Sequence, residues 1–262
     1  MADRYTYIPL IGLFIVIAWG VPEIVAQWRH RKILLTIFAT VLLSILMTVT
    51  WKHLRHWGNS ITLFEHTLEV TSNNYLAHNN LGVALDIQGR TQEAINHYLK
   101  ALRIKPDYVE VHNNLGGALH KQGRAQEAIN HYLKALRIKP DYVEAHNNLG
   151  ATLHKQGRTQ EAIDHYLEAL RIKPDYVDAH NNLGLALDKQ GRTQEAIDHY
   201  LEALRIKPDL EEAHNNLGVA LFRKGKIGEA VEHFRTALRI KPDHIHAKNN
   251  LKKVLMIQQQ KQ

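Results

Sequence analysis

The sequence predicts an all-α protein in which a membrane-embedded helical hairpin is followed by a solenoid of stacked helix pairs. Two observations carry this prediction. A motif ending in Lys-Pro-Asp recurs with its prolines 34 residues apart, at Pro106, Pro140, Pro174, Pro208 and Pro242. Such a fixed period indicates a repeat architecture. Ahead of the repeats, residues 8–51 are mostly apolar, which is typical of membrane helices.

The chain divides into four expected segments. Residues 1–56 form a membrane region with transmembrane helices at about 8–26 and 33–51. Residues 57–74 form a single helix equivalent to the second half of a repeat. Residues 245–262 form a capping helix and a tail. Between them lie five 34-residue copies, numbered 1 to 5: residues 75–108, 109–142, 143–176, 177–210 and 211–244.

Residue choices within copy 2 explain two helices joined by a turn. Asp107 followed by Glu110 has the spacing of a capping box, which predicts the start of the first helix. Gly116 lies on its apolar stripe, where a missing Cβ lets a partner helix approach. Gly123 suits a left-handed residue that ends this helix. The second helix buries Ala128, Tyr132, Ala135 and Leu136, and Pro140 prevents its continuation.

These residues resemble the tetratricopeptide-repeat (TPR) family. Counting Tyr75 as position 1, the family's characteristic positions fall on Leu81, Gly82, Leu85, Ala94, Tyr98, Ala101 and Pro106. One departure is position 4, where the family often has a large aromatic residue and this chain has His78. The resemblance implies a right-handed superhelix whose first helices line a concave groove that binds proteins or extended peptides.

The membrane helices are inferred from length and charge. Ile33–Trp51 carries no charged residue and, as a helix, would span roughly 28 Å, enough for a bilayer core. Ile8–Ala26 is interrupted by Gly20, Pro22 and Glu23 and is a weaker span. A cleaved signal peptide is the alternative, but the start of the chain is not basic and no small-residue cleavage pattern follows.

The segment Ala2–Leu13 (ADRYTYIPLIGL) resembles the membrane half of transmembrane-and-TPR O-mannosyltransferases and their bacterial relatives. The resemblance extends over roughly residues 2–74. It implies an integral protein of the bacterial inner membrane whose repeats face the periplasm, although basic residues flank both sides and leave the orientation open. The acidic loop that carries the family's catalytic residues has no equivalent here, so no catalytic residue is assigned and the chain is not expected to be an enzyme.

On a helical wheel, positions 2, 6, 9 and 13 of each first helix lie opposite the packed stripe. Position 6 is asparagine in every copy, and an amide can pair with any peptide backbone through its donor and acceptor. A row of amides that holds an extended peptide is one interpretation, and hydrogen bonds to neighbouring helices or to water are the other. The candidate peptide-binding residues are Asn80, Asn114, Asn148, Asn182 and Asn216, with Glu110, Glu144, Asp178, Lys121, Lys155 and Lys189 beside them.

Histidine recurs at positions 4 and 23, but these lie on different helices, so we expect no metal site. Position 4 is expected to be a half-buried packing residue and position 23 a solvated one. The sequence contains no cysteine and no nucleotide-binding motif, so no cofactor is expected. Although the net charge is +7, acidic residues alternate with the basic ones, which does not favour a nucleic-acid partner.

The expected function is a membrane-anchored scaffold for proteins or extended peptides. One alternative is a C-terminal fragment of a membrane O-glycosyltransferase, mannosyltransferase-like or similar to O-GlcNAc transferases, whose repeats present substrate. A second alternative is a spacer without a ligand. The sequence does not define the oligomeric state, the partner, or whether Met1 is the natural start.

Overall fold

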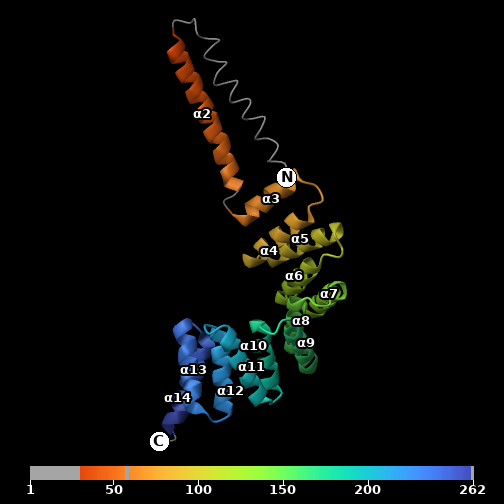
Figure 1. Ribbon diagram of the computed structural model, residues 1–262, viewed down its shortest axis with the longest axis vertical. Helices are drawn as coiled ribbons and strands as arrows, with labels where there is room; N and C mark the ends of the chain where they lie inside the picture. Colours follow the sequence, from red (N-terminus) through yellow and green to blue (C-terminus); the bar gives the residue numbers. More distant parts are fainter. Residues whose placement is uncertain (1–29, 57–58, 261–262) are drawn as a thin grey trace. The chain divides into compact units, whose positions relative to one another are not determined.

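A computed structural model describes residues 30–56 and 59–260 of the chain (Figure 1). All regular secondary structure in these residues is helical. The chain separates into two compact units, Met1–His66 and Thr67–Gln262. Each unit is considered separately below.

The first unit contains helix α2 (Arg31–His56), and α3 (Ser60–Val70) crosses from it into the second unit. The expected membrane helix at 33–51 lies within α2, whereas the one at 8–26 falls outside the described residues. Large apolar side chains of α2 are exposed, with Met47 71% accessible. Within residues 30–56 and 59–260, however, no helix has both the length and the hydropathy needed to cross a membrane. The described part of the chain therefore does not support the expected hairpin.

The second unit is a series of antiparallel helix pairs followed by one last helix (Figure 1). Each first helix contacts its own second helix and also the first helix of the next pair, whereas successive second helices have no comparable contact within the described residues. The pairs are α4 (Tyr75–Ile87) with α5 (Thr91–Ile104), α6 (Val109–Lys121) with α7 (Ala125–Ile138), α8 (Val143–Lys155) with α9 (Thr159–Ile172), α10 (Val177–Lys189) with α11 (Thr193–Ile206), and α12 (Glu211–Arg223) with α13 (Ile227–Ile240), before α14 (Ile245–Gln260).

The turn inside each pair depends on one glycine. Gly123 has a φ of +78°, and the next residue, Arg124, donates its backbone N–H to the carbonyl of Leu119 at 3.0 Å. This is the left-handed helix end expected at Gly123. The expected capping box of Asp107 and Glu110 is wrong. The helix begins at Val109, so its N-cap is Tyr108, which makes no side-chain capping bond, and Asp107 lies one residue too early.

Packing within a pair brings a second recurring glycine, Gly116 in copy 2, against an aromatic ring. A Cβ built on Gly116 would lie 2.6 Å from Cε1 of Tyr132, whose side chain is 2% exposed. The close approach of α6 and α7 therefore needs glycine at this position. Ala128 and Ala135 are fully buried beside the ring, as expected, while Leu136 is only half-buried and Ile129 takes a buried place.

Candidate functional site

The asparagines at positions 5 and 6 connect successive first helices. The Nδ2 group of Asn148 donates to Oδ1 of Asn113 in the preceding copy at 3.0 Å. Every described first helix from α6 to α14 makes the same bond, to a residue 35 positions earlier. We call this series the asparagine ladder: Asn114 to Asn79, Asn148 to Asn113, Asn182 to Asn147, Asn216 to Asn181 and Asn250 to Asn215.

The two ladder positions have different environments. The acceptors at position 5 are buried in four copies, as for Asn147, which is 6% exposed. The donors at position 6, such as Asn148, are half-buried. Because an amide has two N–H donors and two acceptor lone pairs, the ladder bond occupies only part of the capacity of each position-6 residue. The position-6 asparagines that the sequence analysis names as candidate peptide-binding residues thus form hydrogen bonds to the neighbouring helix.

The charged residues predicted beside the asparagines lie on the same exposed arc. Glu110, Glu144 and Asp178 are exposed and form no ion pair within the described residues. Lys121 differs, because its Nζ lies 2.6 Å from Oδ2 of Asp86 in the preceding copy. Lys155 and Lys189 have no equivalent partner, since the residue in place of Asp86 is histidine in copies 2 and 3, at His120 and His154.

The histidines at positions 4 and 23 are paired within each copy. The two Nδ1 atoms of His112 and His131 are 3.0 Å apart, and all five copies repeat this contact at 3.0–3.1 Å. Position 23 is half-buried and hydrogen-bonded, so the expectation of a solvated side chain there is wrong. The pairs are His78 with His97, His112 with His131, His146 with His165, His180 with His199, and His214 with His233.

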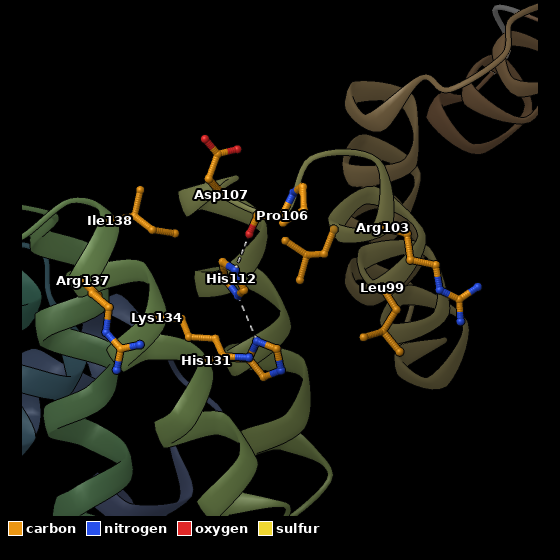
Figure 2. Close-up of a pocket in the computed structure, with 10 residues that line it drawn as sticks. Leu99, Arg103, Pro106, Asp107, His112, His131, Lys134, Arg137 and Ile138 are labelled. Atoms are coloured by element: carbon orange, nitrogen blue, oxygen red, sulfur yellow. Dashed lines mark hydrogen bonds between the residues drawn. The ribbon is translucent and has the colours of Figure 1, made fainter.

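In copies 2 to 5 the proton positions follow from a bond between the position-4 histidine and a backbone carbonyl. Nε2 of His112 lies 2.9 Å from the carbonyl oxygen of Pro106, which can only accept, so this Nε2 donates (Figure 2). A neutral His112 then accepts at Nδ1 from the Nδ1–H of His131. Burial, followed by the proximity of His112 and Lys134, lowers the pKa of His131 to about 4. Burial, with His78 and Lys100 nearby, likewise lowers the pKa of His97 to about 4.

Within residues 30–56 and 59–260, no group of three or more histidine, cysteine or acidic side chains could hold a metal ion. The Nδ1 atoms of the paired histidines are instead hydrogen-bonded to each other. Sequence reasoning missed both the pairs and the role of position 5. The available signal was that positions 4 and 23 are histidine in every copy and that the asparagines always occur as a doublet.

Comparison with protein families covers the whole repeat region. Models described as TPR repeat match residues 87–123 and 116–157, and models described as tetratricopeptide repeat match residues 63–96, 141–209 and 177–243. The chain belongs to the TPR family. TPR arrays act as protein-interaction scaffolds, and the fold of this chain is of that type.

Relatives and solved structures agree with this assignment. Protein O-mannosyl-transferase TMTC3 of Mus musculus is 29% identical over 110 residues, which is 41% of this chain but only 12% of the mouse protein. This match lies in the TPR repeats, whereas the resemblance noted for residues 2–74 stays a prediction. The crystal structure of the MamA protein is 30% identical, with a TM-score of 0.54 over 64% of this chain and 92% of MamA. YrrB, described as a TPR protein with an unusual peptide-binding site, shares the fold at 23% identity, with a TM-score of 0.54 over 72% of this chain and 97% of YrrB.

Proposed function

We propose that the TPR solenoid binds an extended polypeptide along the face formed by its first helices, through the position-6 asparagines. The observation that carries the proposal is the asparagine ladder, which repeats one amide in one orientation on successive helices. A ligand backbone would pair with the remaining donor and acceptor capacity of each amide. This pairing is independent of the ligand's sequence.

The ladder bond itself supports such binding. An exposed asparagine loses rotamer freedom when it binds a ligand, which weakens the interaction. Here Nδ2 of Asn114, Asn148 and Asn182 is already bonded to the preceding helix, so much of that freedom is lost on folding. Preorganised groups bind more tightly because less ordering accompanies association. The exposed Glu144 and Lys155 on the same arc have opposite charges. The backbone of the ligand would therefore matter more than the sign of its net charge.

The first prediction concerns a triple variant, Asn114→Ala, Asn148→Ala and Asn182→Ala. Each lost ligand bond is worth about 0.5–1.5 kcal/mol, so binding should weaken at least about tenfold. The same variant also loses three ladder bonds, and its melting temperature should therefore fall. The measurement is the affinity of the full-length chain for a peptide selected on it from a display library.

A matched control separates the two effects. Asn79→Ala, Asn113→Ala and Asn147→Ala together remove the same three ladder bonds from the acceptor side. This control should be destabilised at least as much, because the bonds from Asn79 to Asn80 and from Asn147 to Asn148 are lost as well. Its affinity for the peptide should fall by less than that of the first variant, because its position-6 amides remain and only their preorganisation is lost. Equal affinity in the two triple variants would show that the asparagines serve only the fold.

We also propose that residues 8–51 attach the chain to a bacterial inner membrane, with the repeats on the periplasmic side. Support comes from the uncharged stretch Ile33–Trp51 and from exposed apolar side chains on α2, including Ile37 and Ile45. Hydroxyl groups of α2 bond back to the helix, as Ser44 does to the carbonyl of Thr40 at 2.8 Å. Such bonds satisfy polar groups in an apolar surrounding.

This attachment predicts that the full chain stays in the membrane pellet after carbonate extraction, because alkaline carbonate removes proteins held by charge but leaves proteins inserted in lipid. A variant without residues 1–56 is the control and should be released. Full-length protein in the supernatant would contradict the proposal.

A second candidate function is presentation of substrate to a glycosyltransferase. Its support is the similarity of the repeats to those of O-mannosyl-transferases, of which the matched part is about one eighth. The repeats would then hold the acceptor polypeptide, and sugar transfer would need residues beyond those assigned here. An upstream, in-frame coding region with many membrane spans would favour this function over a separate scaffold.

A further inference from the structure

A cleft lies between the second helices of copies 1 and 2, on the opposite side of each helix pair from the asparagine ladder. Its volume is about 600 Å³. Leu99 and Arg103 of α5 line one side, and Lys134, Arg137 and Ile138 of α7 line the other (Figure 2). His112 and His131 lie between the two helices, and Pro106 and Asp107 come from the connection between α5 and α6. The cleft exists because α5 and α7 do not pack closely, in contrast to α4 and α6.

The lining combines apolar surface with an excess of positive charge. Leu99 is 41% exposed and Ile138 is 42% exposed, so apolar area faces solvent within the cleft. Arg103, Lys134 and Arg137 contribute three cations against the single carboxylate of Asp107. None of these cations has an ion-pair partner among the residues that the structure describes.

The next copies provide an internal comparison, because the position of Lys134 carries the opposite charge there and the position of the neutral Asn130 becomes acidic. Residues 34 positions after Asn130 and Lys134 are Asp164 and Glu168. Glu168 binds Arg171, the counterpart of Arg137, with 2.7 Å between Oε1 and Nη2. Copy 4 repeats this pair between Glu202 and Arg205 at 2.7 Å. The exposed leucine is retained, with Leu167 49% exposed, so the main difference of copies 3 and 4 from copies 1 and 2 is the charge at this position.

We propose that this cleft is a second binding site, for an acidic polypeptide segment that carries an apolar side chain. Carboxylates of the segment would pair with Arg103, Lys134 and Arg137, and its apolar side chain would lie against Leu99 and Ile138. Arginine is suited to this role because its planar group binds a carboxylate through two hydrogen bonds. The five side chains that would contact the segment all come from second helices, whereas the ladder lies on first helices, so both sites can be occupied together.

The test measures fluorescence anisotropy of a labelled peptide of about ten residues, rich in Asp and Glu with one central Leu, on the full-length chain. Physiological ionic strength is used, where charges beyond about 8 Å are screened. The acidic peptide should bind, whereas a peptide with Gln in place of every acid should not. Replacing the central Leu by Ser should weaken binding severalfold, and unchanged affinity would contradict the apolar contact.

Variants taken from the chain's own copies locate the site. Lys134→Glu recreates the Glu168–Arg171 pattern within copy 2 and should weaken binding at least about tenfold. Glu168→Lys should create a second cleft of the same kind and raise the number of bound peptides. Because lysine and glutamate both occur at this position in the chain, both variants should fold.

A charge-matched control addresses general attraction. Lys252→Glu changes the net charge by the same amount as Lys134→Glu, but at an exposed position of α14 that belongs to neither the cleft nor the ladder, and should leave affinity within about twofold. Equal weakening by the two variants would overturn the proposal, as would wild-type affinity in Lys134→Glu. Lys134-dependent binding to phosphatidylserine vesicles without binding to the peptide would assign the cleft to lipid and also overturn it.

Discussion

Gly116→Ala is expected to destabilise the solenoid by about 1–3 kcal/mol, although alanine is the better helix former. The added methyl group would lie 2.6 Å from Cε1 and 2.8 Å from Cδ1 of Tyr132. This ring is almost completely buried. Either α6 and α7 must separate or the ring must leave its preferred rotamer, and both raise the free energy of the folded state.

The adjacent residue is the control. Alanine at Gly117 would approach only the hydroxyl group of Tyr132, at 3.8 Å, an ordinary contact. Copy 3 already has Ala151 at this position. Gly117→Ala should therefore stabilise the chain by up to about 1 kcal/mol through helix propensity. The measurement is the midpoint of chemical denaturation for each variant, followed by the circular dichroism signal of the helices. Similar midpoints for both variants would mean that the close contact with Tyr132 is not required.

The second large effect is a loss of stability in mild acid, caused by the histidine pairs. Burial lowers the folded-state pKa of His97 and His131 to about 4, whereas the pKa of histidine in an unfolded chain is about 6.5. The unfolded state thus gains protons first. Stability is fully present above pH 6.5 and is lost as the pH falls from 6.5 to 4. Because the rings are half-exposed, each pair contributes on the order of 1 kcal/mol by pH 5, and the melting temperature should fall by roughly 10 °C.

A variant that lacks three of the five position-23 histidines checks the cause. Asparagine can place an N–H near the position of Nδ1, so His131→Asn, His165→Asn and His199→Asn should retain a donor to position 4. The melting temperature of this variant should change distinctly less between pH 7 and pH 5. Carboxylates do not interfere in this range. Glu127, whose pKa is lowered by its hydrogen bond to Arg124, loses its contribution only below about pH 4.5. An unchanged pH dependence would assign the effect to other groups.

The sequence predicted what depends on local spacing. The helix pairs, the left-handed Gly123 and the close approach at Gly116 follow from a fixed period and from residue types with one conformational role. The expected capping box was wrong because the spacing of Asp107 and Glu110 marks a helix start only if Asp107 is the N-cap, and the helix begins one residue later. Tyr108 then occupies the N-cap, and no local rule detects that shift.

What the sequence missed depends on contacts between helices. A helical wheel gives the directions of His112 and Asn113 around one helix. It does not show their partners His131 and Asn148, which lie 19 and 35 positions later in the sequence. Both sequence separations are the same in every copy, so a search for residues that recur together would find these pairs. It would not reveal the cleft between α5 and α7, which depends on how far successive second helices diverge.

Every bond of the asparagine ladder connects residues separated by the same number of positions. The ladder can therefore form with any number of copies. If residues 143–176 were deleted in frame, Asn182 would meet Asn113 in the geometry that Asn148 has now. Nearly identical copies also favour unequal recombination between the DNA segments that encode them. Lineages carrying this protein can thus gain or lose whole 34-residue units without interrupting the ladder. The reach of the molecule becomes a heritable quantity that changes in steps, while its ends and joints stay constant.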